Sequence, residues 1–141
     1  MKVKFLLLLF SVLFLSSCSD DDENIMSDEA HTYRVVFEAS GTDYTAHTHV
    51  LNADNVPLYD ETENKDLKQA FIEEKFVGKK IYYTTDKVQV FTSNGFISSK
   101  TRASLTMTVY EDNKEVYKNT VSVPDGENTT KDLRYYINNI E

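Results

Sequence analysis

The chain has 141 residues, of which 40% are hydrophobic and 12% aromatic, enough for one packed domain and too few for a large enzyme. Lys and Arg total 15 against 23 Asp and Glu, and the resulting net charge of −8 disfavours a nucleic-acid partner, whose phosphates attract clustered Lys and Arg. The single cysteine excludes an intramolecular disulfide, a cysteine-based zinc site and an iron–sulfur cluster.

Residues 1–17 have the pattern of a secretory signal peptide. Lys2 and Lys4 form a short positive segment, and residues 5–15 are an apolar run that only Ser11 interrupts. This run is too short to cross a bilayer, which takes about 20 apolar residues. The sequence therefore predicts an exported protein whose signal peptide is removed.

Small residues and a cysteine follow the apolar run, in the order Leu15-Ser16-Ser17-Cys18. This segment resembles the lipobox of bacterial lipoproteins, in which the peptidase cuts before the cysteine and the thiol becomes a diacylglyceryl thioether. The resemblance implies that Cys18 is the first mature residue and carries the acyl lipids that anchor the chain to a membrane. Each buried CH₂ of such lipids contributes about 0.8 kcal/mol, so several chains make a durable anchor. The alternative is an ordinary signal peptide with an incidental cysteine.

Residues 18–31 are polar and acidic, and we interpret them as a flexible tether. The run Ser19-Asp20-Asp21-Asp22-Glu23 resembles the export signal of surface lipoproteins in Bacteroidota, which directs them to the outer leaflet. We therefore expect an outer-membrane lipoprotein that is exposed on the cell surface. The alternatives are that the acidic run is a solvated spacer and that the domain faces the periplasm.

The folded domain is predicted to span residues 32–141, and it opens with a hairpin. Apolar and polar residues alternate over residues 33–39 and again over residues 44–50, which is the pattern of half-buried strands. The turn between them is Gly41-Thr42-Asp43. One side of each strand is therefore expected to face the core.

The stretch after this hairpin is less regular. Residues 52–65 are rich in Asn and acids and are predicted to form a loop. Residues 66–76 are predicted to form a short helix, with Asp66 as its N-cap and Gly78 as its stop signal. As a strand this segment would alternate poorly, because Glu74 would share a face with apolar residues.

Strand patterns return in the second half of the domain, over residues 80–85, 87–92, 103–110, 115–123 and 133–137. Turns are predicted at Ser93-Asn94-Gly95, at residues 111–114 and at Pro124-Asp125-Gly126. About seven strands with turns every 8–12 residues predict an all-β fold, an antiparallel β-sandwich of immunoglobulin-like dimensions. A small barrel is the alternative.

Two segments of this domain resemble a known family. Residues 33–42, YRVVFEASGT, and residues 107–116, MTVYEDNKEV, are similar to segments of small Bacteroidota lipoproteins with an MmpS-like β-sandwich. Asn113 stands where the family has a glycine, and Asn tolerates the left-handed conformation of such a turn. The mycobacterial MmpS proteins are accessory partners of lipid exporters. The resemblance implies the fold, and no residue carries the exporter role over to this chain.

One candidate metal site lies in the first hairpin. His47 and His49 are two residues apart on a predicted strand, so their rings project from the same face about 7 Å apart. Two such rings suit one Zn²⁺, Cu²⁺ or Ni²⁺ ion, with Asp43 or His31 as a third ligand. The alternative is a pair of solvent-facing histidines opposite the buried stripe.

No sequence motif of an enzyme class is found. The chain lacks a nucleophile elbow, a phosphate loop, a dinucleotide fingerprint and a His-Glu-x-x-His zinc signature. The acids between Asp54 and Asp66 lack the register of an EF-hand, and we interpret them as a solvated loop. We therefore expect a non-enzymatic protein with no cofactor apart from the lipid at Cys18.

Three tyrosines, Tyr82, Tyr110 and Tyr136, lie on strand faces opposite the predicted core stripes. An exposed tyrosine can stack on a sugar or anchor a protein partner, and the alternative is that these rings cover the second face of a small sandwich. The sequence thus favours a surface binding module for a protein or a glycan. The alternatives are an accessory structural subunit of an outer-membrane complex or exporter, a metal-binding envelope protein using His47 and His49, and an inhibitor that neutralises a toxin.

Overall fold

A computed structural model describes residues 29–137, and these residues form ten β-strands. The signal peptide, Cys18 and the acidic run from Ser19 to Glu23 lie outside the described residues. Within residues 29–137 no helix is long and apolar enough to cross a membrane. In chain order the strands are β1 Tyr33–Gly41, β2 Tyr44–Asn52, β3 Leu58–Asp60, β4 Lys65–Asp66, β5 Phe71–Phe76, β6 Lys79–Thr84, β7 Phe91–Ser99, β8 Ala103–Glu111, β9 Lys114–Val123 and β10 Thr129–Tyr136.

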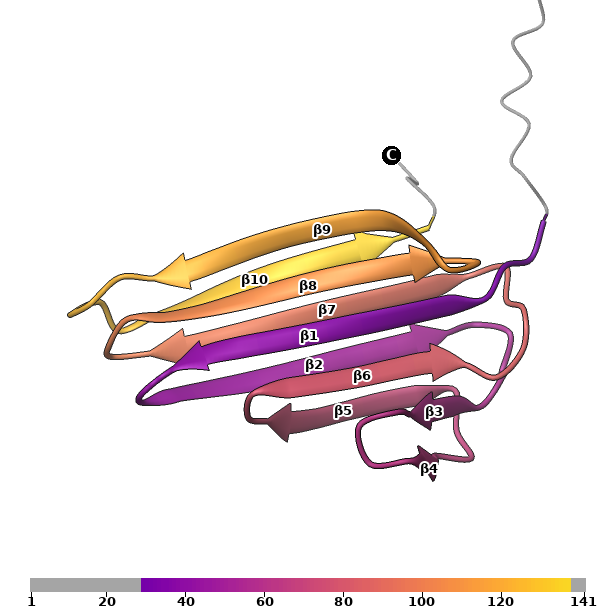
Figure 1. Cartoon of the computed structure of the whole chain (residues 1–141), viewed down its shortest axis with the longest axis horizontal. Coiled ribbons are helices and arrows are strands. Elements are labelled where there is room, and N and C mark those ends of the chain that lie inside the picture. Colours follow the sequence, from indigo (N-terminus) through magenta and orange to yellow (C-terminus); the bar gives the residue numbers. More distant parts are fainter. Residues whose placement is uncertain (1–28, 138–141) are drawn as a thin grey trace, which may run out of the picture.

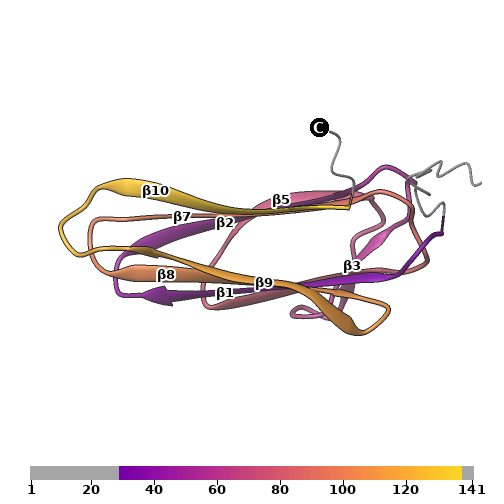
Figure 2. The same ribbon diagram turned by 90° about the horizontal axis from the view of Figure 1, so that it is seen from above.

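The strands form two antiparallel sheets packed face to face (Figure 1 and Figure 2). One sheet has six strands in the order β4-β3-β6-β1-β8-β9, and the other has four in the order β10-β7-β2-β5. The predicted all-β antiparallel sandwich is confirmed. The strands beyond the predicted seven are β3, β4 and β5, which lie in the stretch interpreted as loop and helix.

Apolar side chains from alternate positions of both sheets form the core between the layers. Phe37, Leu105 and Met107 of the six-stranded sheet and Val50 and Ile97 of the four-stranded sheet are fully buried. The core stripes predicted for residues 33–39, 44–50 and 103–110 are therefore confirmed. Burial of each such side chain stabilises the fold by about 1.5–3 kcal/mol.

The predicted turn at Ser93-Asn94-Gly95 is wrong. These three residues lie inside β7, and of the strand predicted at residues 87–92 only residues 91 and 92 belong to β7. Gly95 belongs to the strand because it gives room to the opposite sheet: a Cβ there would lie 3.1 Å from the Phe37 ring and 3.0 Å from Leu105. The glycine thus serves a close approach between the sheets and not a turn.

The predicted helix at residues 66–76 is also wrong. Residues 71–76 form β5, an edge strand that pairs with β2. Glu74 shares the inner face of β5 with Phe76. A charged residue on that face breaks the apolar–polar alternation by which a strand is recognised from sequence. Glu74 is accommodated there because Lys80 and the hydroxyl of Tyr82 contact it.

The turn between β8 and β9 follows the prediction. Asp112 and Asn113 have φ values of 46° and 68°, so both occupy the left-handed region. Two consecutive residues of this kind form the tight turn whose twist matches a β-hairpin. Asn113 therefore adopts the left-handed conformation that this turn requires, without a glycine.

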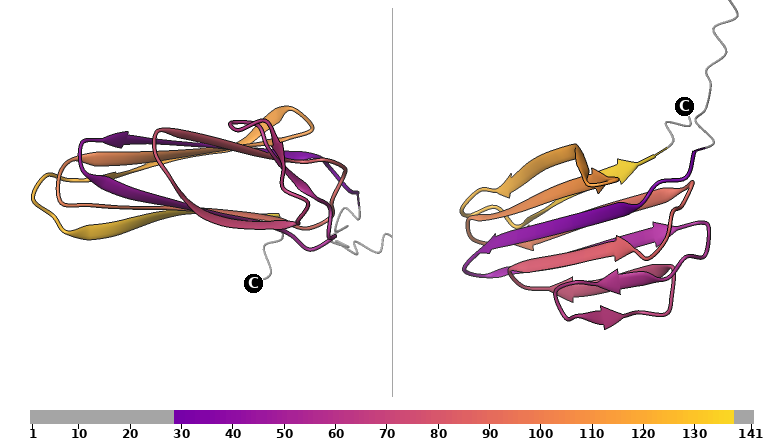
Figure 3. Two further views of the ribbon diagram at one scale, coloured as in Figure 1. Left: turned by 90° about the horizontal axis from the view of Figure 1, so that it is seen from below. Right: turned by 45° about the vertical axis from the view of Figure 1, so that its right-hand side comes forward.

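The described chain begins and ends at the same end of the sandwich, as Figure 1 and the two views in Figure 3 show. His31, which was assigned to the tether, pairs with Val88 through backbone hydrogen bonds of 3.0 and 2.8 Å. Asp112 accepts hydrogen bonds from the backbone N–H and the hydroxyl of Thr32. These contacts fix the point at which the chain enters the domain.

Candidate functional site

A row of aromatic and basic side chains crosses the outer face of the six-stranded sheet. It consists of Tyr59, Tyr83, Arg34 and Tyr110, which face one another on β3, β6, β1 and β8. The rings of Tyr59 and Tyr83 stack with centroids 4.9 Å apart, and the Arg34 guanidinium lies 5.7 Å from the centre of the Tyr110 ring. We call this row the tyrosine–arginine ladder.

Arg34 is held in place by an ion pair with Glu61. Its Nε and Nη2 donate hydrogen bonds of 2.8 and 2.9 Å to the two carboxylate oxygens. This hydrogen bonding raises the pKa of Arg34 and lowers the pKa of Glu61, so both groups stay charged. The two-point contact orients the guanidinium as well as attracting it. Arg34, in the middle of the ladder, and Glu61 beside it thus form a preorganised hydrogen-bond donor and acceptor.

A shallow hollow of about 340 Å³ opens over the ladder. Arg34, Glu61, Tyr83 and Tyr110 line it, together with Asn113 from the β8–β9 turn. Aromatic surface, an amide, a guanidinium and a carboxylate therefore meet around one small depression. Such a set can pack against an apolar ring face and hydrogen-bond hydroxyl or amide groups at its edge.

The three tyrosines chosen from the sequence do not form one surface. Tyr110 belongs to the ladder, and Tyr136 is 48% exposed on β10 of the other sheet. The prediction is wrong for Tyr82, which is fully buried. The inner face of β6 carries Lys80, Tyr82 and Thr84, so Tyr83 points outward instead.

Sequence reasoning missed most of the ladder. Tyr83 is next to Tyr82, the tyrosine predicted to be exposed. It would have been chosen instead if the inward and outward faces of β6 had been assigned correctly. Tyr59 lies in a three-residue strand within a predicted loop, and Glu61 follows that strand. No local signal links these two residues to Arg34.

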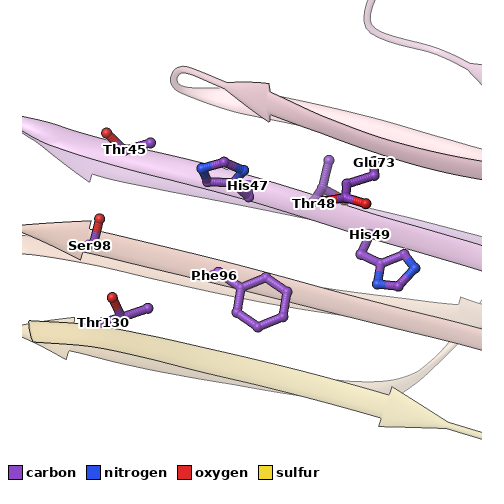
Figure 4. Close-up of a pocket in the computed structure, with 8 residues that line it drawn as sticks. All are labelled: Thr45, His47, Thr48, His49, Glu73, Phe96, Ser98 and Thr130. Atoms are coloured by element: carbon purple, nitrogen blue, oxygen red, sulfur yellow. The ribbon is translucent and has the colours of Figure 1, made fainter.

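A second hollow, of about 500 Å³, lies on the outer face of the four-stranded sheet. Figure 4 shows His47 and His49 one after the other along β2, with the Phe96 ring on the neighbouring strand. His49 lies opposite Glu73 of β5, and its ring meets the Phe71 ring edge-on with centroids 5.0 Å apart. Both histidines therefore face outward, as the strand period predicts.

The two proposed third ligands do not join these histidines. Asp43 lies in the β1–β2 turn and lines a different hollow. His31 Nδ1 lies 2.7 Å from Asp112 Oδ2, and the hydrogen bond between them raises the pKa of His31 and lowers that of Asp112 to about 2. Among residues 29–137, no His, Cys, Asp or Glu completes a three-ligand group with His47 and His49. A metal at this pair stays a prediction.

A cluster of charged side chains extends from the space between the sheets to the turn after β3, and the sequence did not indicate it. The ammonium nitrogen of Lys80 lies 2.7 Å from Asp60 Oδ2, 2.5 Å from Glu63 Oε1 and 2.9 Å from Glu74 Oε1. The side chains of Lys80 and Asp60 are only 7% and 2% exposed. The interpretation of the acids as a solvated loop is therefore wrong for Asp60. We call these four residues the Lys80 cluster.

Lys80 is held in its charged form within the cluster. Burial by itself would lower the pKa of Lys80, but hydrogen bonds to the three carboxylates outweigh it and raise the pKa. The Tyr82 hydroxyl donates to Glu74, and burial followed by this contact raises the pKa of Tyr82. The cluster therefore ties β3, β5 and β6 together through ion pairs with Lys80.

No family model matches the sequence, and no curated protein does either. Solved structures do share its fold. A protein from Parabacteroides distasonis, determined in a calcium-bound form, has 25% sequence identity and a TM-score of 0.66 over 84% of this chain and 99% of its own.

Two further structures are similar. A domain of unknown function, DUF4425, from Bacteroides vulgatus has 16% identity and a TM-score of 0.65, over 76% of this chain and 94% of its own. A DUF4425 family protein from Bacteroides ovatus has 18% identity and a TM-score of 0.63, over 80% of this chain and all of its own. These likenesses confirm the β-rich fold and support an origin in Bacteroidota.

Proposed function

We propose that this chain is a lipid-anchored outer-membrane lipoprotein that acts, without enzymatic activity, as a surface binding module, with the tyrosine–arginine ladder as its binding surface. The ladder carries the proposal. Tyr and Arg are among the residues enriched at the energetic centre of binding surfaces. Here three tyrosines and one arginine lie in register on four strands outside the core, and Arg34, Tyr83 and Tyr110 line a hollow.

A glycan is the ligand that fits this hollow best. A sugar offers an apolar ring face for a tyrosine and neighbouring hydroxyls for a paired donor and acceptor. The Arg34–Glu61 pair, with its hydrogen bonds of 2.8 and 2.9 Å, provides that pair beside Tyr83 and Tyr110. A protein partner is the alternative, because the same residues can anchor a protein interface.

Binding to purified polysaccharides, measured by titration, tests the glycan proposal. Tyr83→Ala and Tyr110→Ala should each weaken binding at least tenfold, which corresponds to about 1.4 kcal/mol. Tyr136→Ala is the matched control and should leave binding unchanged, because Tyr136 lies on the other sheet.

Photo-crosslinking in intact cells tests the protein alternative. A photoreactive amino acid at position 83 should then capture a partner, whereas the same group at position 136 should not. If no polysaccharide binds and position 83 captures nothing, the ladder is not a binding surface.

The lipid anchor and the surface position are supported by Cys18 and by the acidic run from Ser19 to Glu23. Protease added to intact cells should remove the wild-type domain. It should spare a variant with Asp20, Asp21 and Asp22 changed to Ala, if the run is the export signal. Mass spectrometry of the mature protein should find acyl lipid on Cys18. If both forms are protected from the protease, the domain faces the periplasm, and a role in an envelope complex is favoured.

The second candidate function is an accessory subunit of an outer-membrane complex. It is favoured by a row of exposed apolar residues on the four-stranded sheet, Phe71, Leu51 and Tyr136, which are 41%, 40% and 48% exposed. Cross-strand pairing places Leu51 between Phe71 and Thr92, and Thr92 opposite Tyr136. A crosslink from position 71 to an envelope protein, with none from position 83, would favour this candidate.

Calcium binding does not fit the residues that the structure describes. The similar protein from Parabacteroides distasonis is known in a calcium-bound form. In residues 29–137 of this chain, one group of three carboxylates comes close enough to hold a metal ion, and it consists of Asp60, Glu63 and Glu74. Lys80 already contacts all three. We therefore assign no calcium ion to the proposed function.

A further inference from the structure

The carboxylates of the Lys80 cluster are arranged as ligands of a single cation. One oxygen each from Asp60, Glu63 and Glu74 lies within 4.8 Å of the other two. No other group of three such side chains occurs in the part of the chain that the structure describes. The Lys80 nitrogen lies 2.5–2.9 Å from all three oxygens, in the place of an ion.

The cluster joins elements that are otherwise separate. Asp60 ends β3 and Glu63 lies in the turn after it, while Lys80 is on the neighbouring strand β6. Glu74 comes from β5 of the opposite sheet. A cation at this point therefore holds the short β3–β4 edge to β6 and closes the sandwich between its two sheets. Structural metal ions stabilise small domains in the same way, by joining elements that are far apart in the chain.

We propose that Asp60, Glu63 and Glu74 form a cation site that this chain fills with the ammonium group of Lys80 in place of a metal ion. The ammonium forms an ion pair with each of the three carboxylates and donates a hydrogen bond to Glu63. Because Lys80 belongs to the same chain, no ion has to be captured from solution. The domain therefore folds independently of calcium.

The site keeps features of a metal site. Three carboxylates surround one positive charge, so the cluster retains an excess of negative charge. The backbone N–H of Glu63 donates to Asp60 and the Tyr82 hydroxyl donates to Glu74, and both contacts offset part of that excess. Thr48 lies opposite Glu74 on β2, fully buried, and its hydroxyl has no hydrogen-bond partner among the described residues. Without the ammonium, the three carboxylates would provide the hard oxygen ligands that Ca²⁺ prefers.

Removal of the ammonium tests the inference. The variant Lys80→Met keeps a chain of similar length and loses the charge. The full chain, purified in a mild detergent, is unfolded thermally in EGTA and in calcium chloride up to 10 mM, and calcium binding is measured by calorimetry. We expect the melting temperature of the wild type to be the same in both solutions. Lys80→Met should melt lower in EGTA and regain stability in calcium, with a Kd of about 10⁻⁴–10⁻³ M, the range of extracellular calcium modules.

Two further variants separate this site from general charge effects. Lys79→Met removes the same charge from the adjacent residue, whose side chain is 53% exposed and pairs with Glu38, and it should behave as the wild type does. The double variant Lys80→Met with Asp60→Asn should lose the calcium response, because the most buried carboxylate is then neutral.

The outcomes are distinct even where Lys80→Met unfolds in EGTA. Refolding of that variant in calcium supports the inference, and failure to respond to calcium overturns it. The inference is also overturned if the wild type binds calcium and Asp60→Asn abolishes that binding, since the metal would then share the site with Lys80. None of these results depends on the lipid anchor or on a ligand of the ladder.

Discussion

The Lys80 cluster and the Arg34–Glu61 pair are made of similar charged groups and differ in their surroundings. Lys80 is 7% exposed and contacts three carboxylates, whereas Arg34 and Glu61 are 35% and 42% exposed and contact mainly each other. Removing one partner of a buried ion pair leaves an uncompensated charge in a poorly solvated place, while water screens the exposed pair. We therefore expect the buried Lys80 cluster to stabilise the fold and the exposed Arg34–Glu61 pair to be available for ligand binding.

The largest effect is expected from the centre of the Lys80 cluster. Lys80→Met in EGTA should lower the free energy of unfolding by about 3–5 kcal/mol, because three carboxylates lose their common partner. Urea unfolding followed by circular dichroism measures this change. Lys79→Met should change it by less than about 0.5 kcal/mol, since Lys79 is on the surface. Equal effects of the two variants would show that burial does not distinguish these lysines.

A smaller effect on the free energy of unfolding is expected at Tyr82, the uncharged residue that contacts the cluster. Tyr82→Phe removes only the hydroxyl that donates to Glu74 and keeps the buried ring. Loss of a hydrogen bond to a charged group should lower the free energy of unfolding by about 1.5–3 kcal/mol. Tyr83→Phe is the control in the same unfolding experiment and should be close to neutral, because Tyr83 faces outward.

The exposed pair should contribute little to stability and much to binding. Arg34→Ala should change the free energy of unfolding by at most about 1 kcal/mol, the range of surface ion pairs. The same variant should lose most of the affinity for the polysaccharide or protein partner of the ladder. If Arg34→Ala unfolds readily but binds normally, the Arg34–Glu61 pair contributes to stability and not to binding.

The smallest effect is expected at the exposed contact between His31 and Asp112. Its hydrogen bond raises the pKa of His31 above 6.5 and lowers that of Asp112 from 3.8 to about 2. The stabilisation from His31 is present below pH 6.5 and is lost as the pH rises through the raised pKa. That from Asp112 is present above pH 3.8 and is lost as the pH falls towards 2.

The wild type should therefore exceed His31→Gln in melting temperature most clearly between about pH 4 and 6.5. Melting curves of both proteins at pH 5.5 and pH 9 test this expectation. A difference that grows from pH 5.5 to pH 9 would contradict it.

Two wrong predictions in different elements have the same cause. Glu74 on β5 and Lys80 on β6 both point inward. Because of Glu74, a helix was predicted where β5 lies. Because of Lys80, Tyr82 was predicted to be exposed instead of Tyr83. A hydrophobic pattern places charged residues outside, which is correct where each charge must stay in water. It fails here because Lys80, Asp60 and Glu74 compensate one another inside the fold.

The sequence by itself determined the all-β class, the first hairpin, the strand at residues 103–110 and the β8–β9 turn. Each depends on neighbouring residues, through the period of two along a strand or the conformational preference of Asn and Gly. Only the tertiary structure decided that Gly95 lies inside a strand, that Tyr59 meets Tyr83, and that Lys80 lies among three carboxylates. These outcomes depend on contacts between strands far apart in the chain, and the energies that decide them exist only once those strands are together.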